Sequence, residues 1–378
     1  MKQIPLFKPK FNTERSIELI RECLDIGWTG IGFRTEQFEA QWSRHVGAAY
    51  SHFLNSSTAG LHLAVQILGS VDQWPSDSEI ITTPLTFIST NHAILYNGYL
   101  PIFADCDSSG NLSVESVLTS ITPKTRCVVF VGLGGNFGHL PEIAAVCNER
   151  GIRLIVDAAH MAGSTFEGKT PNSFGDITVY SFQAVKNLPT GDSGMICCAD
   201  PVMDSLARKL SWLGIDKDTF QRSKDGAYKW DYDVPILGYK YHGNSLMASI
   251  ALAQLDVLEA DNQHRRRVFS WYHELLDQSH LRIITHRNEV SSSRHLVQVC
   301  VDNREALMLW LSEHGVGTGV HYKDNTLYPM YRDCPSRALY VRKLWPQMLS
   351  LPCHLGLDRQ DVQYICETIN AFWSSESS

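Results

Sequence analysis

The stretch Arg153-Leu154-Ile155-Val156-Asp157-Ala158-Ala159-His160 places a carboxylate directly after a short apolar run. A second strand-like run, Ile177–Phe182, leads to Lys186 and then to the glycine-containing turn Gly191–Gly194. Near-continuous apolar runs indicate strands buried on both faces, as in a parallel sheet. Such sheets bind ligands beyond the carboxyl ends of their strands. We therefore expect Asp157 and Lys186 to meet at one edge of a sheet.

Further strand candidates lie on both sides of this pair and alternate with helical segments. The repetition predicts an α/β fold with a mostly parallel sheet and helices on both faces. The predicted strands are Ser51–Asn55, Glu79–Pro84, Pro101–Asp105, Cys127–Val131, Arg153–Asp157, Ile177–Phe182 and Gly194–Cys198, and the predicted helices are Ser57–Leu68, Ile88–Asn97 and Pro141–Arg150. Four segments then converge on one edge of the sheet, namely Asn55–Thr58, Pro84–Phe87, Asp157–His160 and Ser181–Lys186.

The last third of the chain indicates a smaller carboxyl-terminal domain of the α+β type. Its expected elements are a long helix from Ser245 to about Gln278, a strand at His295–Val301, a helix at Arg304–His314, a strand at Gly319–Tyr322 and a last helix after Leu357. A length of 378 residues fits two domains. We place the large domain, with the amino-terminal segment, at residues 1–245 and the small one at residues 246–378.

Composition argues against several classes of protein. A net charge of −7 offers no basic surplus for nucleic acid. No apolar stretch approaches the roughly 20 residues that span a bilayer, and the amino terminus lacks the core of a signal peptide, so we expect a cytoplasmic protein without a membrane partner. The ten cysteines are scattered without metal-binding spacing, which predicts reduced thiols and no metal site. The glycine-rich stretch Gly132–Gly138 fits neither a P-loop nor a dinucleotide fingerprint.

A lysine and an aspartate placed in this way suit one cofactor in particular. Pyridoxal 5'-phosphate (PLP) needs a lysine that forms a Schiff base and an aspartate that pairs with its pyridinium nitrogen. The ordinary alternatives are a surface lysine and an aspartate that caps a helix. The buried strand before Lys186 and the glycine-rich turn after it favour the catalytic interpretation. The sequence therefore predicts a PLP enzyme in which Lys186 holds the cofactor and moves a proton.

Several short motifs occur along the chain in a fixed order. They are Gly27–Gly30, Asn55–Leu61, Thr86–Thr90, Asp157–His160, Ser181–Asn187, Gly238–Tyr241, Gly319–Tyr322 and Ser350–Pro352. In this order, over nearly the whole length, they resemble the DegT/DnrJ/StrS family of fold-type I PLP-dependent nucleotide-sugar aminotransferases. The resemblance implies a homodimer with shared active sites.

The same resemblance implies transfer of an amino group from L-glutamate, leaving 2-oxoglutarate, to a 4-keto or 3-keto 6-deoxysugar linked to a nucleotide diphosphate. Such an enzyme serves deoxyamino-sugar biosynthesis, for example for a lipopolysaccharide O-antigen. Two alternatives stay open, amination of a free cyclic ketone of the inosose or aminohydroxybenzoate type and a PLP-binding regulator without turnover. A third branch, the sugar dehydratases, has histidine in place of the lysine, and Lys186 argues against it.

The resemblance also assigns roles around the cofactor. Asp157 is expected at the pyridine nitrogen, His160 at the phenolic oxygen and Phe87 against the ring face. Ser57, Thr58 and Ser181 are expected at the phosphate, where a helix amino terminus offers unpaired N–H groups and a favourable dipole. The ordinary alternatives are a structural histidine, a core phenylalanine and hydroxyls that only cap the helix.

Lys240 is the clearest departure from the family pattern. Many members have asparagine there, contributed across the dimer to the phosphate, and a lysine could meet the phosphate as a point charge. The substrate candidates are Trp28, Thr29, Arg222, Lys229, His321 and Tyr322. Packing in the small domain and a solvated charged loop are the alternatives for the last four.

Overall fold

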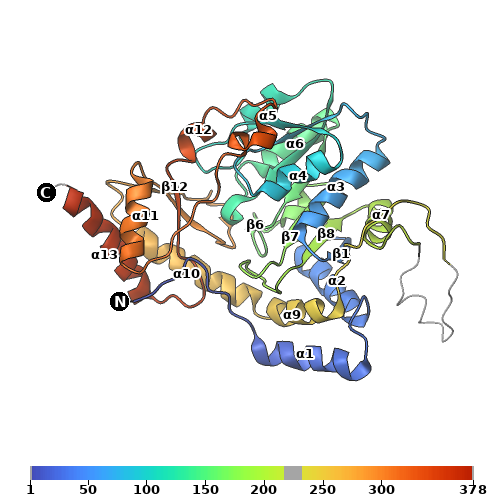
Figure 1. Ribbon diagram of the computed structural model, residues 1–378, viewed down its shortest axis with the longest axis horizontal. Helices are drawn as coiled ribbons and strands as arrows, with labels where there is room; N and C mark the ends of the chain where they lie inside the picture. The colour runs from blue at the N-terminus through green and yellow to red at the C-terminus, as the bar shows by residue number, and fades with distance from the viewer. Residues whose placement is uncertain (1, 217–231, 377–378) are drawn as a thin grey trace.

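A seven-stranded sheet forms the centre of the molecule, whose computed structural model describes residues 2–216 and 232–376 (Figure 1). The strand order is β1-β8-β7-β5-β4-β2-β3. Strand β8 is antiparallel to both neighbours, and the other pairs are parallel, which confirms the predicted mostly parallel sheet. The bounds are β1 (Tyr50–Leu54), β2 (Glu79–Thr82), β3 (Leu100–Phe103), β4 (Thr125–Val131), β5 (Arg153–Asp157), β7 (Ile177–Ser181) and β8 (Gly194–Cys198).

Helices cover both faces of this sheet, as the βαβ pattern predicts. One face is buried by α2 (Phe33–Val46), α6 (Leu140–Arg150) and α9 (Ser245–Leu255), and the other by α3 (Ser57–Val71), α4 (Ile88–Tyr96) and α7 (Pro201–Ser211). Three further helices are α1 (Thr13–Ile26), α5 (Val114–Ser120) and α10 (Leu258–Leu275), and α10 contributes Val268 and Tyr272 to the hydrophobic cluster of the carboxyl-terminal part.

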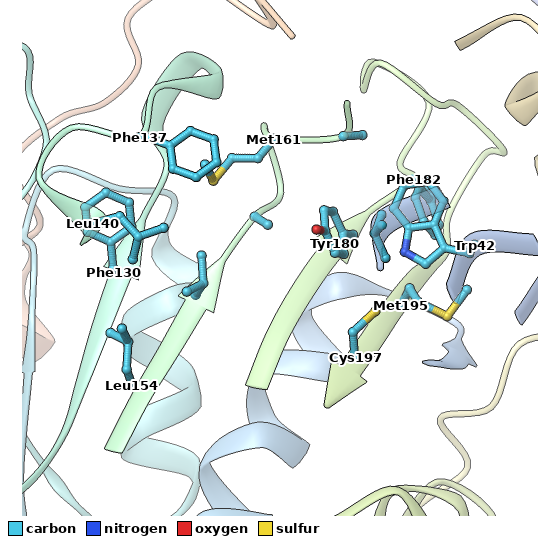
Figure 2. Packing of buried hydrophobic residues seen from close by; sticks show 14 of the residues in the cluster. Trp42, Phe130, Phe137, Leu140, Leu154, Met161, Tyr180, Phe182, Met195 and Cys197 are labelled. Atoms are coloured by element: carbon cyan, nitrogen blue, oxygen red, sulfur yellow. The ribbon is translucent and has the colours of Figure 1, made fainter. Parts of the chain in front are cut away.

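Alternate residues of each strand enter different cores, because successive side chains of a strand point to opposite faces. In β5, Leu154 and Val156 join one cluster and Ile155 joins the other. In the first cluster, the indole of Trp42 packs edge-on against Tyr180 and Phe182, with ring centroids 5.0 Å apart in each pair (Figure 2). Burial on both faces explains why the strands are almost wholly apolar.

A separate hydrophobic cluster lies in the carboxyl-terminal part of the chain, called the small part below, whose helices α11 and α13 lie at the left of Figure 1. Its elements are β9 (Arg282–Ile283), β11 (Val297–Cys300) and β12 (Met348–Leu351), which form a three-stranded sheet, and α11 (Arg304–Glu313) and α13 (Arg359–Glu376). Short elements elsewhere are β6 (Thr165–Phe166), β10 (Val290–Ser291) and α12 (Val341–Leu344). Ile4 also belongs to this cluster, and the division at residue 245 stays a prediction.

Two predicted elements are wrong. The single long helix from Ser245 is broken after Leu255, because α9 packs against α1 and α2 whereas α10 packs against α13, so the two halves bury their apolar residues in different places. The segment Gly319–Tyr322 is not a strand. Only Gly319 pairs with a neighbour, Ser350, and the chain then turns His321 and Tyr322 into a cavity.

The described residues contain no helix that is long and apolar enough to cross a membrane.

Candidate active site

The carboxyl-terminal edge of the sheet surrounds a cavity of about 420 Å³. Segments after β1, β5 and β7 and before α4 and β8 reach it, and two segments of the small part close it. The structure brings together these predicted site residues in the lining: Ser57, Thr58, Phe87, Asp157, His160, Ser181, Lys186, His321 and Tyr322. The structure therefore confirms that the four predicted segments meet at one edge of the sheet.

Lys186 lies in the loop that joins the antiparallel strands β7 and β8. Backbone hydrogen bonds close this loop from Phe182 N to Ser193 O (2.9 Å) and from Ala184 N to Gly191 O (2.7 Å). Burial lowers the pKa of the Lys186 amine to about 8, and the negative charge of Asp157 offsets part of this shift. The loop thus carries a less basic amine than an ordinary lysine to the edge of the cavity.

The Asp157 carboxylate is buried and held from two sides. Thr90 Oγ1 donates to Asp157 Oδ2 at 2.8 Å, and the backbone N–H of Ala159 donates to Oδ1 at 3.1 Å. Since Thr90 uses its only hydrogen here, the Thr86 hydroxyl must donate to Thr90, 2.9 Å away. Burial raises the pKa of the Asp157 carboxyl, while these two donors and the charge of Lys186 lower it.

The amino terminus of α3 opens onto the cavity beside Ser181. Ser56, not Ser57 or Thr58, is the N-cap, because Ser56 Oγ accepts the N–H of Ala59 at 3.1 Å. The alternative that Ser57 and Thr58 only cap this helix is therefore not needed, because Ser56 is the capping residue. Gly194 allows this approach, since a Cβ at that position would lie 2.5 Å from the nitrogen of Ser57.

Phe87 lies at the mouth of the cavity, at the N-cap of α4, and 57% of its surface is exposed. Phenylalanine is usually buried, so core packing does not explain its position. Its ring lies near that of Tyr322, with ring centroids 6.0 Å apart. An exposed ring face at this point suits stacking against a flat ligand.

Three histidines line the cavity wall, of which His160 and His295 are buried and His321 is partly buried, and only His160 and His321 were singled out from the sequence. Burial lowers the pKa of His160 and of His295 well below the ordinary value, and that of His321 to about 4. The positive charge of Lys186 acts in the same direction on all three. The wall is therefore polar but uncharged at neutral pH.

Other predicted residues lie elsewhere. The Lys240 amine lies 3.5 Å from the ring centroid of Trp212, outside the cavity of its own chain. Trp28 and Thr29 follow α1 and do not line the cavity either; the indole of Trp28 donates to the carbonyl of Ile31 at 2.5 Å. Arg222 and Lys229 lie outside the described residues. The roles of these five residues stay predictions.

Sequence reasoning missed several lining residues, which are Phe7, Ser89, Gln183, Asp192, Ser193 and His295. Asp192 and Ser193 lie within the glycine-containing turn Gly191–Gly194, and Ser89 and Gln183 lie in quoted motifs, so their places along the chain could have suggested them. Phe7 and His295 carry no such signal. They come from the amino-terminal segment and the small part, and only tertiary packing brings them here.

The chemistry of this set of groups fits PLP. An amine and a buried carboxylate share one cavity, a helix amino terminus with two uncommitted serine and threonine side chains faces it, and an exposed ring lies at its mouth. Each group matches one feature of the cofactor, respectively its aldehyde, its pyridinium nitrogen, its phosphate and its ring face.

Comparisons with known proteins point the same way. The sequence model of the DegT/DnrJ/EryC1/StrS aminotransferase family matches residues 11–370. A dTDP-4-dehydro-2,3,6-trideoxy-D-glucose 4-aminotransferase of Saccharopolyspora spinosa is 32% identical over 375 residues, 96% of this chain and 95% of its own.

Two solved structures are similar to the whole chain. The aminotransferase TlmJ from Streptoalloteichus hindustanus has a TM-score of 0.90 at 30% identity, with 100% of both chains covered. The putative sugar aminotransferase Spr1654 from Streptococcus pneumoniae, in its PLP-form, has a TM-score of 0.90 at 26% identity, with 99% of both chains covered.

Proposed function

Because the chain belongs to the DegT/DnrJ/EryC1/StrS aminotransferase family, we propose that it binds PLP in the cavity and transfers an amino group from L-glutamate to a nucleotide-diphosphate-linked keto-6-deoxysugar. Membership makes it a PLP-dependent sugar aminotransferase. The donor, the nucleotide and the keto carbon are the proposed parts. The Saccharopolyspora relative acts on a 4-dehydro sugar carried by dTDP, which supports a nucleotide-linked acceptor and the 4-keto alternative.

The observation that carries the proposal is the placement of Lys186 and Asp157 in one cavity. PLP, when bound, supplies an aldehyde that takes up the amino group and a ring that withdraws electrons from the reacting carbon. The Lys186 amine, with a pKa of about 8, can accept a proton and return it near neutral pH. Asp157 would supply the carboxylate for the pyridinium nitrogen, and hydrogen bonds from Thr90 and Ala159 fix its two oxygens.

The other lining residues bind and orient. The first amides of α3, with Ser57, Thr58 and Ser181, would hold the phosphate, because helix dipole and unpaired N–H groups favour an anion there. His160 would donate to the phenolic oxygen, and Phe87 would cover the ring. His321 and Tyr322 bring the small part into the lining of the same cavity, where the sugar would bind.

The charge of the lining supports the proposed homodimer with shared sites. In the described part of the chain, Lys186 is the only lysine or arginine that lines the cavity. Cofactor, donor and nucleotide diphosphate are all anions and need further cations. We propose that a second copy supplies one of them, Lys240, whose amine stacks on Trp212 without reaching its own cavity.

Mixing two inactive variants tests this sharing. If Lys240 serves the partner's site, a Lys186→Ala and Lys240→Ala mixture should regain activity after subunit exchange, because one site of each mixed dimer keeps both lysines. No regain in verified mixed dimers, or a monomer in sedimentation, would contradict the shared site.

The proposed activity is tested with purified protein, PLP, L-glutamate and a panel of nucleotide keto-sugars, with the amino product read by mass spectrometry. Borohydride should fix the cofactor to the peptide that contains Lys186. Turnover of a free cyclic ketone but of no nucleotide sugar would contradict the proposed acceptor. The cytoplasmic location stays a prediction.

A further inference from the structure

His295 is a buried wall residue of the cavity with only 1% of its surface exposed. Its ring packs between two others, with centroids 4.3 Å from His160 and 5.8 Å from Phe7, and the Phe7 ring is stacked nearly parallel to it at 15°. Its Nδ1 lies 2.9 Å from Asn187 Oδ1. Asn187 directly follows Lys186 but does not line the cavity, so the ring reaches the cavity with its other edge.

The direction of this hydrogen bond follows from backbone carbonyls, which can only accept. Asn262 Nδ2 donates to the carbonyl of Ala162 at 2.9 Å, so the Asn262 oxygen faces Asn187. Asn187 Nδ2 donates both to that oxygen and to the carbonyl of Ser293, each at 2.7 Å. The remaining Asn187 oxygen is therefore an acceptor, and His295 Nδ1 must carry the proton.

His160 has the opposite arrangement. The backbone N–H of Gly134, which can only donate, points to His160 Nδ1 at 3.2 Å. The neutral ring must then carry its proton on Nε2, which lies 3.2 Å from the Tyr322 hydroxyl. The two neighbouring histidines thus present different edges, with an N–H on His160 and a lone pair on His295.

The His295 lone pair has no hydrogen-bond donor within the described ranges 2–216 and 232–376. We propose that His295 Nε2 is a substrate-binding group that accepts a hydrogen bond from a hydroxyl of the acceptor sugar. This rests on the proposed function. A hydroxyl can donate to the lone pair, whereas a carboxylate of the amino-acid donor would face it with another acceptor, so the group favours the sugar over glutamate.

Two amide substitutions separate this role from a scaffold role. In His295→Asn the amide lies at the level of Nδ1, so it can still donate to Asn187 but offers nothing to the cavity. In His295→Gln the amide lies at the level of Nε2, so its oxygen can serve the cavity while the bond to Asn187 is lost. His295→Gln should therefore lower the melting temperature more than His295→Asn does.

The two half-reactions are measured separately by absorbance: the glutamate half-reaction in the PLP-loaded protein, and the sugar half-reaction in protein loaded with the aminated cofactor, pyridoxamine phosphate, which carries the amino group to be transferred. The keto-sugar concentration for half-maximal conversion should rise roughly tenfold in His295→Asn, the effect of about one lost hydrogen bond, and stay within about threefold in His295→Gln. The glutamate half-reaction should change little in either. A greater sugar defect in His295→Gln, or equal defects in both half-reactions of His295→Asn, would overturn the proposal.

The tautomers themselves are read without activity. Nitrogen NMR of the apo-protein with labelled histidine, assigned by the same variants, should show His295 protonated on Nδ1 and His160 on Nε2. A His295 proton on Nε2 would overturn the inference. If the wild-type protein converts with glutamate but with no nucleotide sugar, the proposed function has failed; if wild type accepts the sugar and His295→Asn matches it, only this inference has.

Discussion

Replacing Thr90 with valine tests how the Asp157 charge is kept in the protein interior. Thr90 is buried and donates to Asp157 Oδ2 at 2.8 Å, and valine keeps its shape but has no hydroxyl. A hydrogen bond to a charged group contributes about 1.5–3 kcal/mol. We expect the apo-protein to lose that much free energy of unfolding when the carboxyl is ionised, and to bind PLP more weakly.

The pH dependence follows from the raised pKa of Asp157 in the folded protein. A folded pKa above the unfolded value means that ionisation costs stability, and this cost grows as pH rises through the folded pKa. Thr90→Val removes a hydrogen bond that lowers this pKa. The loss of unfolding free energy caused by the substitution should therefore become smaller as pH falls and the carboxyl becomes protonated.

The assay is urea denaturation of the apo-protein at about pH 8 and at about pH 5. Thr86→Val is the matched control, because Thr86 bonds to Thr90 and not to the carboxylate; it should cost only about 1 kcal/mol at either pH. Equal losses for the two variants at both pH values would refute the reasoning.

Three further predictions concern the amine and the exposed ring. Lys186→Ala should abolish borohydride fixation of PLP and lower transamination by more than roughly a hundredfold, while a surface lysine variant, Lys124→Ala, should do neither. In the apo-protein, labelling of Lys186 by an amine reagent should rise with pH through about 8, because only the neutral amine reacts; a midpoint near that of ordinary lysines would contradict the pKa shift. Phe87→Ala should weaken PLP binding by about 2–10-fold with little loss of stability, since 57% of the side chain is exposed. Tyr96→Ala, an equally exposed aromatic of α4 outside the cavity, should leave PLP affinity unchanged.

The strand positions in the central sheet were predictable because burial on both faces favours apolar residues along most of each strand. Arg153–Asp157 and Gly194–Cys198 match the structure to the residue, and the other five strands predicted for the central sheet lie within a few residues of it. The meeting of Lys186 and Asp157 then follows from the rule for the carboxyl ends of parallel strands. The break after Leu255 was not predictable, because the apolar pattern does not reveal which partner each half packs against.

The supporting groups of the site were harder to predict than its reactive groups. Thr90 lies in a quoted motif, but nothing local shows that it bonds to a residue far along the chain. In the sequence, His295 looks like any histidine before a strand. Its tautomer follows only from the folded structure, where the carbonyls of Ala162 and Ser293 fix the orientation of the Asn262 and Asn187 amides. The Lys240 amine stacks on the ring of Trp212, and no sequence pattern indicates this tertiary contact.

The loop between β7 and β8 holds Lys186 in a tightly constrained backbone. Both of its ends belong to adjoining strands, and backbone hydrogen bonds from Phe182 to Ser193 and from Ala184 to Gly191 join its two sides. An insertion or deletion of one residue in this loop would move the Lys186 side chain away from the cavity, even if all the other lining residues kept their positions. Engineers who wish to change what this protein accepts should vary the walls and leave the length of that span alone.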